Sequence, residues 1–145
     1  MVISFDLDDT LIAGVKQFAL EPQTLWQRLL SKERLRAGTC ELITALRSRG
    51  YKIYVYTSSY RSFRRIKWLF WLYGIMLDKV INKTIHDRVM GQRAGYISKY
   101  PPAFHIDIHV DDSPGVLREG ELHSFKVLVL SEKEQDWVRM LLQLL

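Results

Sequence analysis

Three carboxylates lie within four positions near the start of the chain, in the segment 2–11 (VISFDLDDTL). The apolar, β-prone run before them is typical of a buried strand that ends at its acids. In such a strand Asp6 and Asp8 share one face, while Leu7 points to the other. Clustered carboxylates raise one another's pKa, so a hard cation such as Mg²⁺ would keep them ionised at neutral pH. The segment therefore predicts a metal site, and an acidic turn after a strand is the alternative.

Polar side chains also follow two later β-prone runs. The run 51–56 (YKIYVY) ends in hydroxyl residues, and the run 104–110 (FHIDIHV) ends in two further acids. In an open parallel α/β sheet, ligands bind beyond the carboxyl ends of the strands, where the strand order reverses. A lysine just before the second run adds a positive charge. We therefore expect one site that contains Asp6, Asp8, Thr57, Ser58, Lys99, Asp111 and Asp112.

This ordered set resembles the haloacid dehalogenase (HAD) superfamily of phosphohydrolases over nearly the whole chain. The segment Asp6-Leu7-Asp8-Asp9-Thr10 is similar to the first sequence motif of that family. Thr57 is similar to the second motif, Lys99 to the third and Asp111-Asp112 to the fourth. The first and fourth motifs are specific, the second is short and the third is a single lysine. The resemblance implies a Rossmann-like three-layer sandwich with a parallel five-stranded sheet. The interval after Leu11 is too short for a full cap domain, so the chain resembles the nearly capless members.

The resemblance and the chemistry together imply roles for the first two acids. Asp6 would attack phosphorus and form an aspartyl-phosphate, which splits hydrolysis into two easier displacements. Asp8 would protonate the leaving alkoxide and then take a proton from the attacking water. Related transport ATPases have threonine in place of Asp8, and dehalogenases lack this second aspartate. By resemblance the chain is therefore a Mg²⁺-dependent phosphatase, and Asp9 is a turn or supporting residue.

The phosphate-binding residues implied by the resemblance are a hydroxyl, a backbone amide and a lysine. The Thr57 hydroxyl and the Ser58 N–H would hold phosphoryl oxygens, and Lys99 would offset negative charge. Each has an alternative. Thr57 would otherwise cap the next helix, and Lys99 would be a solvated loop lysine whose place Lys83 or Lys79 takes.

The metal ligands implied by the resemblance are the Asp6 carboxylate, the Asp8 backbone carbonyl and an acid of the pair that ends the run 104–110. Asp112 aligns with the usual metal-binding acid of the family, whereas Asp111 stands where many relatives have glycine. A further acid found downstream in other members has no clear equivalent near Gly115. Both members of the pair are therefore candidates, and the sequence leaves open which of them ligates the metal directly.

Strands alternate with helices along the chain, which predicts an α/β fold in a single domain, 1–145. After the acidic turn, the segment 13–20 is interpreted as a loop or small hairpin that forms a flap. The segment 83–100 is interpreted as a long loop with room for one small element, and a Ser-x-x-Glu capping box at Ser131 starts the last helix. The expected helices are 22–35, 39–49, 59–73 and 131–145, and the expected strands are 2–5, 51–56, 78–82, 104–110 and 125–130.

Composition favours a cytoplasmic protein with an anionic partner. The net charge of +5 suits a phosphorylated substrate but is spread along the chain, so it does not establish nucleic acid. The single cysteine, Cys40, excludes an internal disulfide and is expected in the core. The N-terminal apolar run lacks a basic leader, and the longest apolar stretch, 68–77, is too short to cross a bilayer, so no membrane partner is expected.

Several features are interpreted without a catalytic role. His105 and His109 on the strand before the second acid pair are expected to be structural rather than metal ligands. The cluster Arg61, Arg64, Arg65 and Lys67, with Trp68 and Trp71 nearby, is interpreted as a solvated helix face over a buried aromatic one, with nucleic-acid binding as the alternative. The apolar last helix packs in the core or against a second copy of the chain.

Two other functions compete with the phosphatase. A phosphoacceptor signalling domain of the receiver type also combines acids, a threonine and a lysine, but it needs an aspartate at the end of a middle strand, where this chain has Thr57. A HAD-like regulatory protein without turnover would bind a protein or nucleic acid through its basic helix. The nearly capless site suggests a bulky substrate, such as a phosphorylated macromolecule or a nucleic-acid end, or a neighbouring subunit that acts as the lid.

Overall fold

A computed structural model describes all residues of the chain, 1–145, and its centre is a five-stranded parallel sheet. The strand order is β3-β2-β1-β4-β5, and every neighbouring pair is parallel. The predicted α/β fold with a Rossmann-like three-layer arrangement is therefore confirmed. The strands are β1 (Val2–Phe5), β2 (Lys52–Tyr56), β3 (Lys79–Ile81), β4 (Ile108–Asp111) and β5 (Lys126–Val129).

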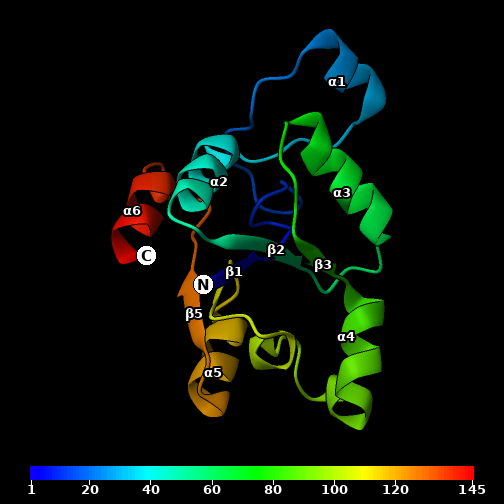
Figure 1. The fold of residues 1–145 in the computed structure, drawn as a ribbon, viewed down its shortest axis with the longest axis vertical. Coiled ribbons are helices and arrows are strands. Elements are labelled where there is room, and N and C mark those ends of the chain that lie inside the picture. The colour runs from blue at the N-terminus through cyan, green and yellow to red at the C-terminus, as the bar shows by residue number, and fades with distance from the viewer.

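Helices cover both faces of the sheet (Figure 1). On one face lie α2 (Thr39–Ser48), α3 (Phe63–Leu72) and α6 (Trp137–Leu144), and α1 (Leu25–Leu30) projects beyond them. On the other face lie α4 (Lys83–Met90) and α5 (Pro114–His123), joined by the 3₁₀ turns η1 (Gly91–Gly95) and η2 (Pro101–Phe104). None of the helices has the length and apolar character needed to cross a bilayer.

The main core lies between the sheet and the layer that contains α2 and α3. Ile3 of β1, Ile53 of β2, Leu46 of α2 and Phe70 of α3 are all fully buried in one apolar cluster. Burying a side chain of this size contributes roughly 1.5–3 kcal/mol. Because β1 is central and packed on both sides, the position of its carboxyl end is fixed by the most buried part of the molecule.

The helix expected over 22–35 is much shorter than predicted. Thr24 caps α1 through a complete capping box with Gln27, but the backbone turns extended at Ser31. Leu35 instead forms an isolated bridge with Ile12. The apolar side chains of α1 are between 52% and 77% exposed, so they form no buried stripe: Leu25, Trp26, Leu29 and Leu30.

The helix expected over 59–73 begins only at Phe63, because Ser62 rather than Ser59 caps it. Residues 57–62 are therefore a loop that is free to line a site. The interpretation of a buried aromatic face is wrong for two side chains, since Trp68 and Trp71 are 44% and 55% exposed. Their rings stack on each other with centroids 5.1 Å apart.

Three other local predictions are wrong. The expected loop 83–100 with one small element instead begins with the eight-residue helix α4, which the Asn82 side chain caps by accepting from the Ile85 N–H, and continues with the turn η1. The helix α5 was not expected, although Ser113 as cap and Pro114 at the first position are ordinary helix-start signals. The last helix begins at Trp137, because the Ser131 hydroxyl accepts from the Lys133 N–H in a tight turn and forms no capping box.

Candidate active site

A cavity of about 380 Å³ lies at the carboxyl ends of β1, β2 and β4. The order β2-β1-β4 places it where the chain switches from one side of β1 to the other, the expected ligand position in this sheet type. The cavity wall also includes Ser59, Ser98, Ser113 and Val116. All the residues predicted for the site line this one cavity: Asp6, Asp8, Thr57, Ser58, Lys99, Asp111 and Asp112.

Sheet pairing continues just past the strand ends and fixes two of these residues. The Asp6 N–H donates to the Val110 carbonyl at 2.8 Å, and the Thr57 N–H donates to the Ile81 carbonyl at 2.9 Å. The backbones of Asp6 and Thr57 are therefore held by the same kind of bonds that hold the sheet. Their side chains start from fixed points at the edge of the cavity.

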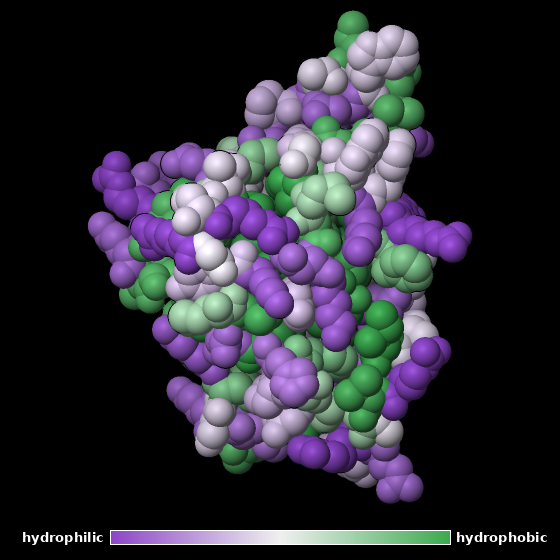
Figure 2. Space-filling view, in the orientation of Figure 1, coloured by the Kyte–Doolittle hydropathy of each residue, from purple (hydrophilic) through white to green (hydrophobic).

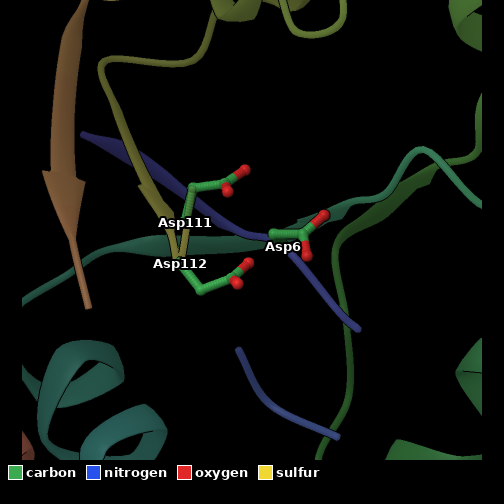
Figure 3. Close-up of side chains that lie close together, drawn as sticks. All are labelled: Asp6, Asp111 and Asp112. Atoms are coloured by element: carbon green, nitrogen blue, oxygen red, sulfur yellow. The ribbon is translucent and has the colours of Figure 1, made fainter. Parts of the chain in front are cut away.

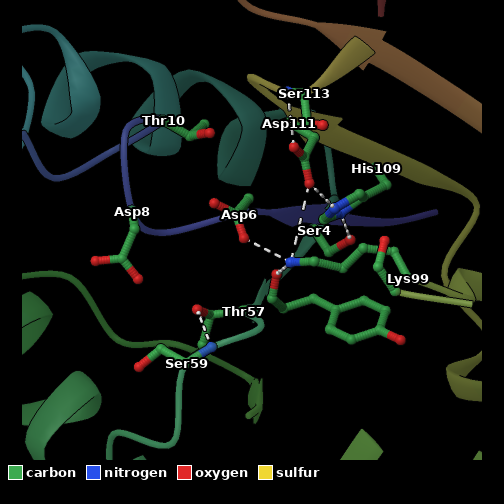
Figure 4. Close-up of polar contacts among 12 residues, drawn as sticks. Ser4, Asp6, Asp8, Thr10, Thr57, Ser59, Lys99, His109, Asp111 and Ser113 are labelled. Atoms are coloured by element: carbon green, nitrogen blue, oxygen red, sulfur yellow. Dashed lines mark hydrogen bonds and ion pairs between the residues drawn. The ribbon is translucent and has the colours of Figure 1, made fainter. Parts of the chain in front are cut away.

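Lys99 is buried against the first acid. Its ammonium donates to Asp6 Oδ1 and to the Tyr56 carbonyl, both at 2.5 Å, and the residue is 2% exposed. Lys83 instead pairs with Asp87 at 2.5 Å, outside the cavity. The structure therefore selects Lys99 over Lys83 as the site lysine. Figure 4 shows the Lys99 ammonium pointing to the Asp6 carboxylate.

Burial raises the pKa of Asp6 to about 7, and the attraction of Lys99 opposes this shift. The nearby carboxylates of Asp111 and Asp112 add to the rise, because like charges disfavour ionisation. Lys99 alone therefore does not supply enough positive charge to keep Asp6 fully ionised.

Three carboxylates converge as a metal site would require. Asp6, Asp111 and Asp112 each offer an oxygen, and these oxygens all lie within 4.8 Å of one another (Figure 3). An all-carboxylate set suits a hard cation that also keeps several waters, such as Mg²⁺. The donor set and its excess of negative charge therefore fit the ion that the sequence predicts.

The two acids at the carboxyl end of β4 have different surroundings. Asp111 accepts from the Ser113 N–H at 2.9 Å and from His109 Nε2 at 3.0 Å. These hydrogen bonds and Lys99 lower the pKa of Asp111, against the effect of burial. Asp112 forms an ion pair with Lys16 at 2.7 Å and accepts from the Thr10 hydroxyl at 3.2 Å.

Asp8 lies in the cavity wall but not in the carboxylate cluster. Its carboxylate pairs with Arg61 at 2.5 Å, and Arg61 also pairs with Glu33 at 2.9 Å. The Asp8 side chain is 42% exposed and lies apart from the group formed by Asp6, Lys99 and Asp111 (Figure 4). The structure therefore places Asp8 at the rim of the cavity.

Asp9 is a turn residue, as the sequence predicts. It has a positive φ of 63°, and its Oδ1 accepts from the Gly14 and Lys16 N–H groups at 2.9 and 2.8 Å. These bonds fix the turn that follows β1. They bring the Lys16 ammonium to Asp112.

The hydroxyl residues after β2 line the cavity without capping the next helix. Thr57 is buried, and its Oγ1 accepts from the Ser59 N–H at 3.1 Å. Because Ser62 caps α3, the alternative role of Thr57 as that helix's cap is wrong. Thr57 and Ser58 therefore face the cavity rather than the start of α3.

No protein-family model matches this chain, and no curated protein matches it either. The chemistry of the site is therefore inferred from its own geometry and from the resemblance of its motifs.

A buried hydrogen-bond network that the sequence did not suggest holds the loop that carries Lys99. The Tyr100 N–H donates to the Tyr56 hydroxyl at 2.9 Å, and that hydroxyl lies 2.5 Å from His86 Nδ1. His86 Nε2 lies 3.0 Å from the Ile97 carbonyl, which can only accept, so Nε2 carries the proton and Nδ1 accepts from Tyr56. The network therefore needs a neutral His86.

A His86→Phe variant should be less stable by about 1–3 kcal/mol at pH 7, because the Tyr56 O–H loses its acceptor and the Ile97 carbonyl loses its donor. Burial, and then the charge of Lys83, lower the pKa of His86. Below the ordinary histidine value of about 6.5 the unfolded state binds the extra proton, so this part of the stability is lost as the pH falls. In urea unfolding, the difference in the free energy of unfolding between parent and variant should be smaller at pH 5 than at pH 7. A difference that stays constant would contradict the neutral His86.

Proposed function

We propose that the chain is a Mg²⁺-dependent phosphatase of the HAD type that hydrolyses a phosphomonoester through an aspartyl-phosphate on Asp6. One observation carries the proposal: the Asp6 carboxylate lies between a buried ammonium and two further carboxylates in one cavity. A nucleophilic carboxylate, a cation site and a fixed positive charge are the parts that phosphoryl transfer needs.

In the first half of the reaction, an Asp6 carboxylate oxygen forms a bond to phosphorus while the bond from phosphorus to the leaving oxygen breaks. Asp8 at the rim gives its proton to the leaving oxygen, so that an alcohol departs. Asp8 must first exchange its ion pair with Arg61 for the substrate. The phosphate of the substrate can then form an ion pair with Arg61 in place of the Asp8 carboxylate.

In the second half, water attacks the phosphorus of the aspartyl-phosphate, the bond from phosphorus to Asp6 breaks, and Asp8 takes the proton of the water. The Thr57 hydroxyl, the Ser58 N–H and the Lys99 ammonium hold the phosphoryl oxygens where negative charge builds up. Mg²⁺, when bound by Asp6, Asp111, Asp112 and the Asp8 backbone carbonyl, would offset the charge of the phosphoryl group.

Phosphate release from a generic aryl phosphate tests this proposal. We expect turnover with Mg²⁺ and none with EDTA, since without the cation the clustered carboxylates repel the substrate anion. Turnover that is insensitive to EDTA would contradict the metal site. A long-lived phosphoryl adduct without turnover would favour the receiver-type function instead.

Lys99→Met should lower kcat/KM on the aryl phosphate by about 10²-fold or more, because it removes a preorganised positive charge beside the nucleophile. Met has a similar length and keeps the apolar part of the side chain. Lys83→Met is the matched control, since Lys83 pairs with Asp87 outside the cavity and should retain parental activity. Equal losses in both variants would contradict the assignment of Lys99.

The surface of α3 favours one substrate class, a phosphorylated nucleic-acid end. Residues 58–77 contain no acid, and Arg64, Lys67, Trp68 and Trp71 form an exposed stripe along the helix. The stripe starts near Arg61 at the cavity rim, and stacking rings with nearby cations are typical of single-strand binding. Figure 2 shows hydrophobic residues at the tip of the adjoining projection that contains α1.

Oligonucleotides with a terminal phosphate test that substrate class. Trp71→Ala and Lys67→Ala should weaken turnover of the oligonucleotide, in a salt-dependent manner for Lys67, and leave the aryl phosphate unaffected. Oligonucleotide binding that survives Asp6→Asn with no turnover in the parent would favour a binding protein. Equal turnover of the oligonucleotide by parent and variants would exclude the stripe from substrate binding.

A further inference from the structure

A buried chain of three polar side chains runs from β1 to the second acid pair. Ser4 Oγ lies 2.7 Å from His109 Nδ1, and His109 Nε2 lies 3.0 Å from Asp111 Oδ2. Ser4 and His109 are 0% exposed and Asp111 is 2% exposed. Ser4 and His109 are register partners on neighbouring parallel strands, which places their side chains on the same face of the sheet (Figure 4).

Hydrogen-bond chemistry fixes the direction of this chain. An ionised carboxylate can only accept, so His109 Nε2 must carry the proton that it shares with Asp111. In a neutral imidazole Nδ1 then accepts, and the Ser4 hydroxyl donates to it. The chain therefore runs from the Ser4 hydroxyl through His109 to Asp111.

Asp111 is thereby held at both carboxylate oxygens. Oδ1 accepts from the Ser113 N–H at 2.9 Å, Oδ2 accepts from His109, and the nearest ammonium, that of Lys99, is 3.9 Å from Oδ2. Each oxygen keeps a lone pair, and neutral donors do not compete with a cation for it. Asp111 is therefore oriented before any cation binds.

Asp112 is in a different state. The Lys16 ammonium is 2.7 Å from its Oδ2, and the Thr10 hydroxyl is 3.2 Å from its Oδ1. A cation that binds Asp112 through Oδ2 must compete with a positive charge already in place. This competition makes Asp112 the weaker ligand, although the family resemblance favours it.

We propose that Asp111 is the principal ligand from β4 for the divalent cation, and that Ser4 and His109 are positioning residues that hold its carboxylate. Hydrogen-bond donors that contact a metal ligand but not the metal orient that ligand and raise the affinity for the metal. The inference rests on the cation site of the proposed function and not on turnover. It reverses the order of importance that the motif alone suggests for the two acids.

Mn²⁺ binding, followed by the EPR signal of the free ion and by competition with Mg²⁺, tests the inference without an activity assay. Asp111→Asn should weaken Mn²⁺ binding more than Asp112→Asn does. His109→Leu should weaken binding about 10- to 100-fold. His109→Gln, which can place an amide N–H near the position of Nε2, should restore most of the affinity. Ser4→Ala should weaken binding less than His109→Leu.

Thermal unfolding in EDTA separates a structural role from a positioning role. A purely structural role would change the unfolding temperature and leave the Mn²⁺ affinity of the folded variant at the parental value, which would overturn the inference. If His109→Leu does not fold, the comparison of Asp111→Asn with Asp112→Asn decides. A larger loss in Asp112→Asn overturns the inference but leaves the phosphatase intact. A parent that binds no Mn²⁺ overturns both.

Discussion

Asp6→Asn is expected to lower the rate of phosphate release by at least about 10³-fold while the fold is retained. An amide is a very poor nucleophile toward phosphorus, so the covalent step is lost. Asn has nearly the same shape, and its carbonyl oxygen can still accept from Lys99, now at 2.5 Å from Asp6 Oδ1. The measurement is kcat/KM on an aryl phosphate with Mg²⁺, together with circular dichroism and thermal unfolding.

The matched control for this variant is Asp87→Asn, which neutralises an acid outside the cavity. It should keep parental activity. A folded Asp6→Asn protein that is as active as the parent would refute the assignment of the nucleophile. The group that attacks phosphorus would then be a water molecule or a different side chain.

Asp8→Asn is expected to lower kcat by about 10²- to 10⁴-fold, the usual range for loss of a general acid or base. The loss should be larger for an alkyl phosphate than for a nitrophenyl phosphate when formation of the aspartyl-phosphate is measured in a single turnover. A nitrophenolate leaves readily without a proton, whereas an alkoxide does not. Rapid-quench measurement of the first step with both substrates checks this prediction.

Glu33→Gln is the control for Asp8→Asn, because Glu33 contacts the same Arg61 but does not line the cavity. Its effect on the chemical step should be small. If the Asp8→Asn loss were the same for both leaving groups, Asp8 would not be the proton donor. Its role would then be limited to holding Arg61.

The sequence was sufficient to predict the sheet and the cavity because both follow from local patterns. Each strand is a short apolar run with a clear end, and parallel strands bring those ends together. Asp6 and Thr57 follow their strands directly and Asp111 ends β4, so their common location needs no knowledge of side-chain packing. Lys99 was harder, because its reach to Asp6 spans 93 positions and depends on how the loop before β4 folds.

Other parts of the site depend on contacts that no local pattern reveals. The pairing of Asp8 with Arg61 joins residues 53 positions apart, and that of Ser4 with His109 joins residues 105 positions apart. Alternation placed His109 in the strand, but only the register between β1 and β4 gives it Ser4 as a partner. The interpretation of His109 as a structural residue rather than a ligand agrees with its buried contacts.

Apolar periodicity alone predicts a longer helix than α1, because it does not show where the backbone leaves the helix. Leu25 and Leu29 have helical spacing, yet the chain leaves the helix at Ser31 so that Leu35 can reach the core. Tertiary burial of one leucine thus outweighs the propensity of the residues before it.

The central claim is that Asp6 takes the phosphoryl group in a cation-dependent step. The most direct measurement is peptide mapping by mass spectrometry of Asp8→Asn protein, quenched in acid during turnover of an aryl phosphate, with Mg²⁺ and with EDTA. The account predicts a phosphoryl group on the peptide that contains Asp6, present only with Mg²⁺ and absent when Asp6 is also replaced by Asn. A phosphoryl group on another side chain, or one that forms equally in EDTA, would contradict it.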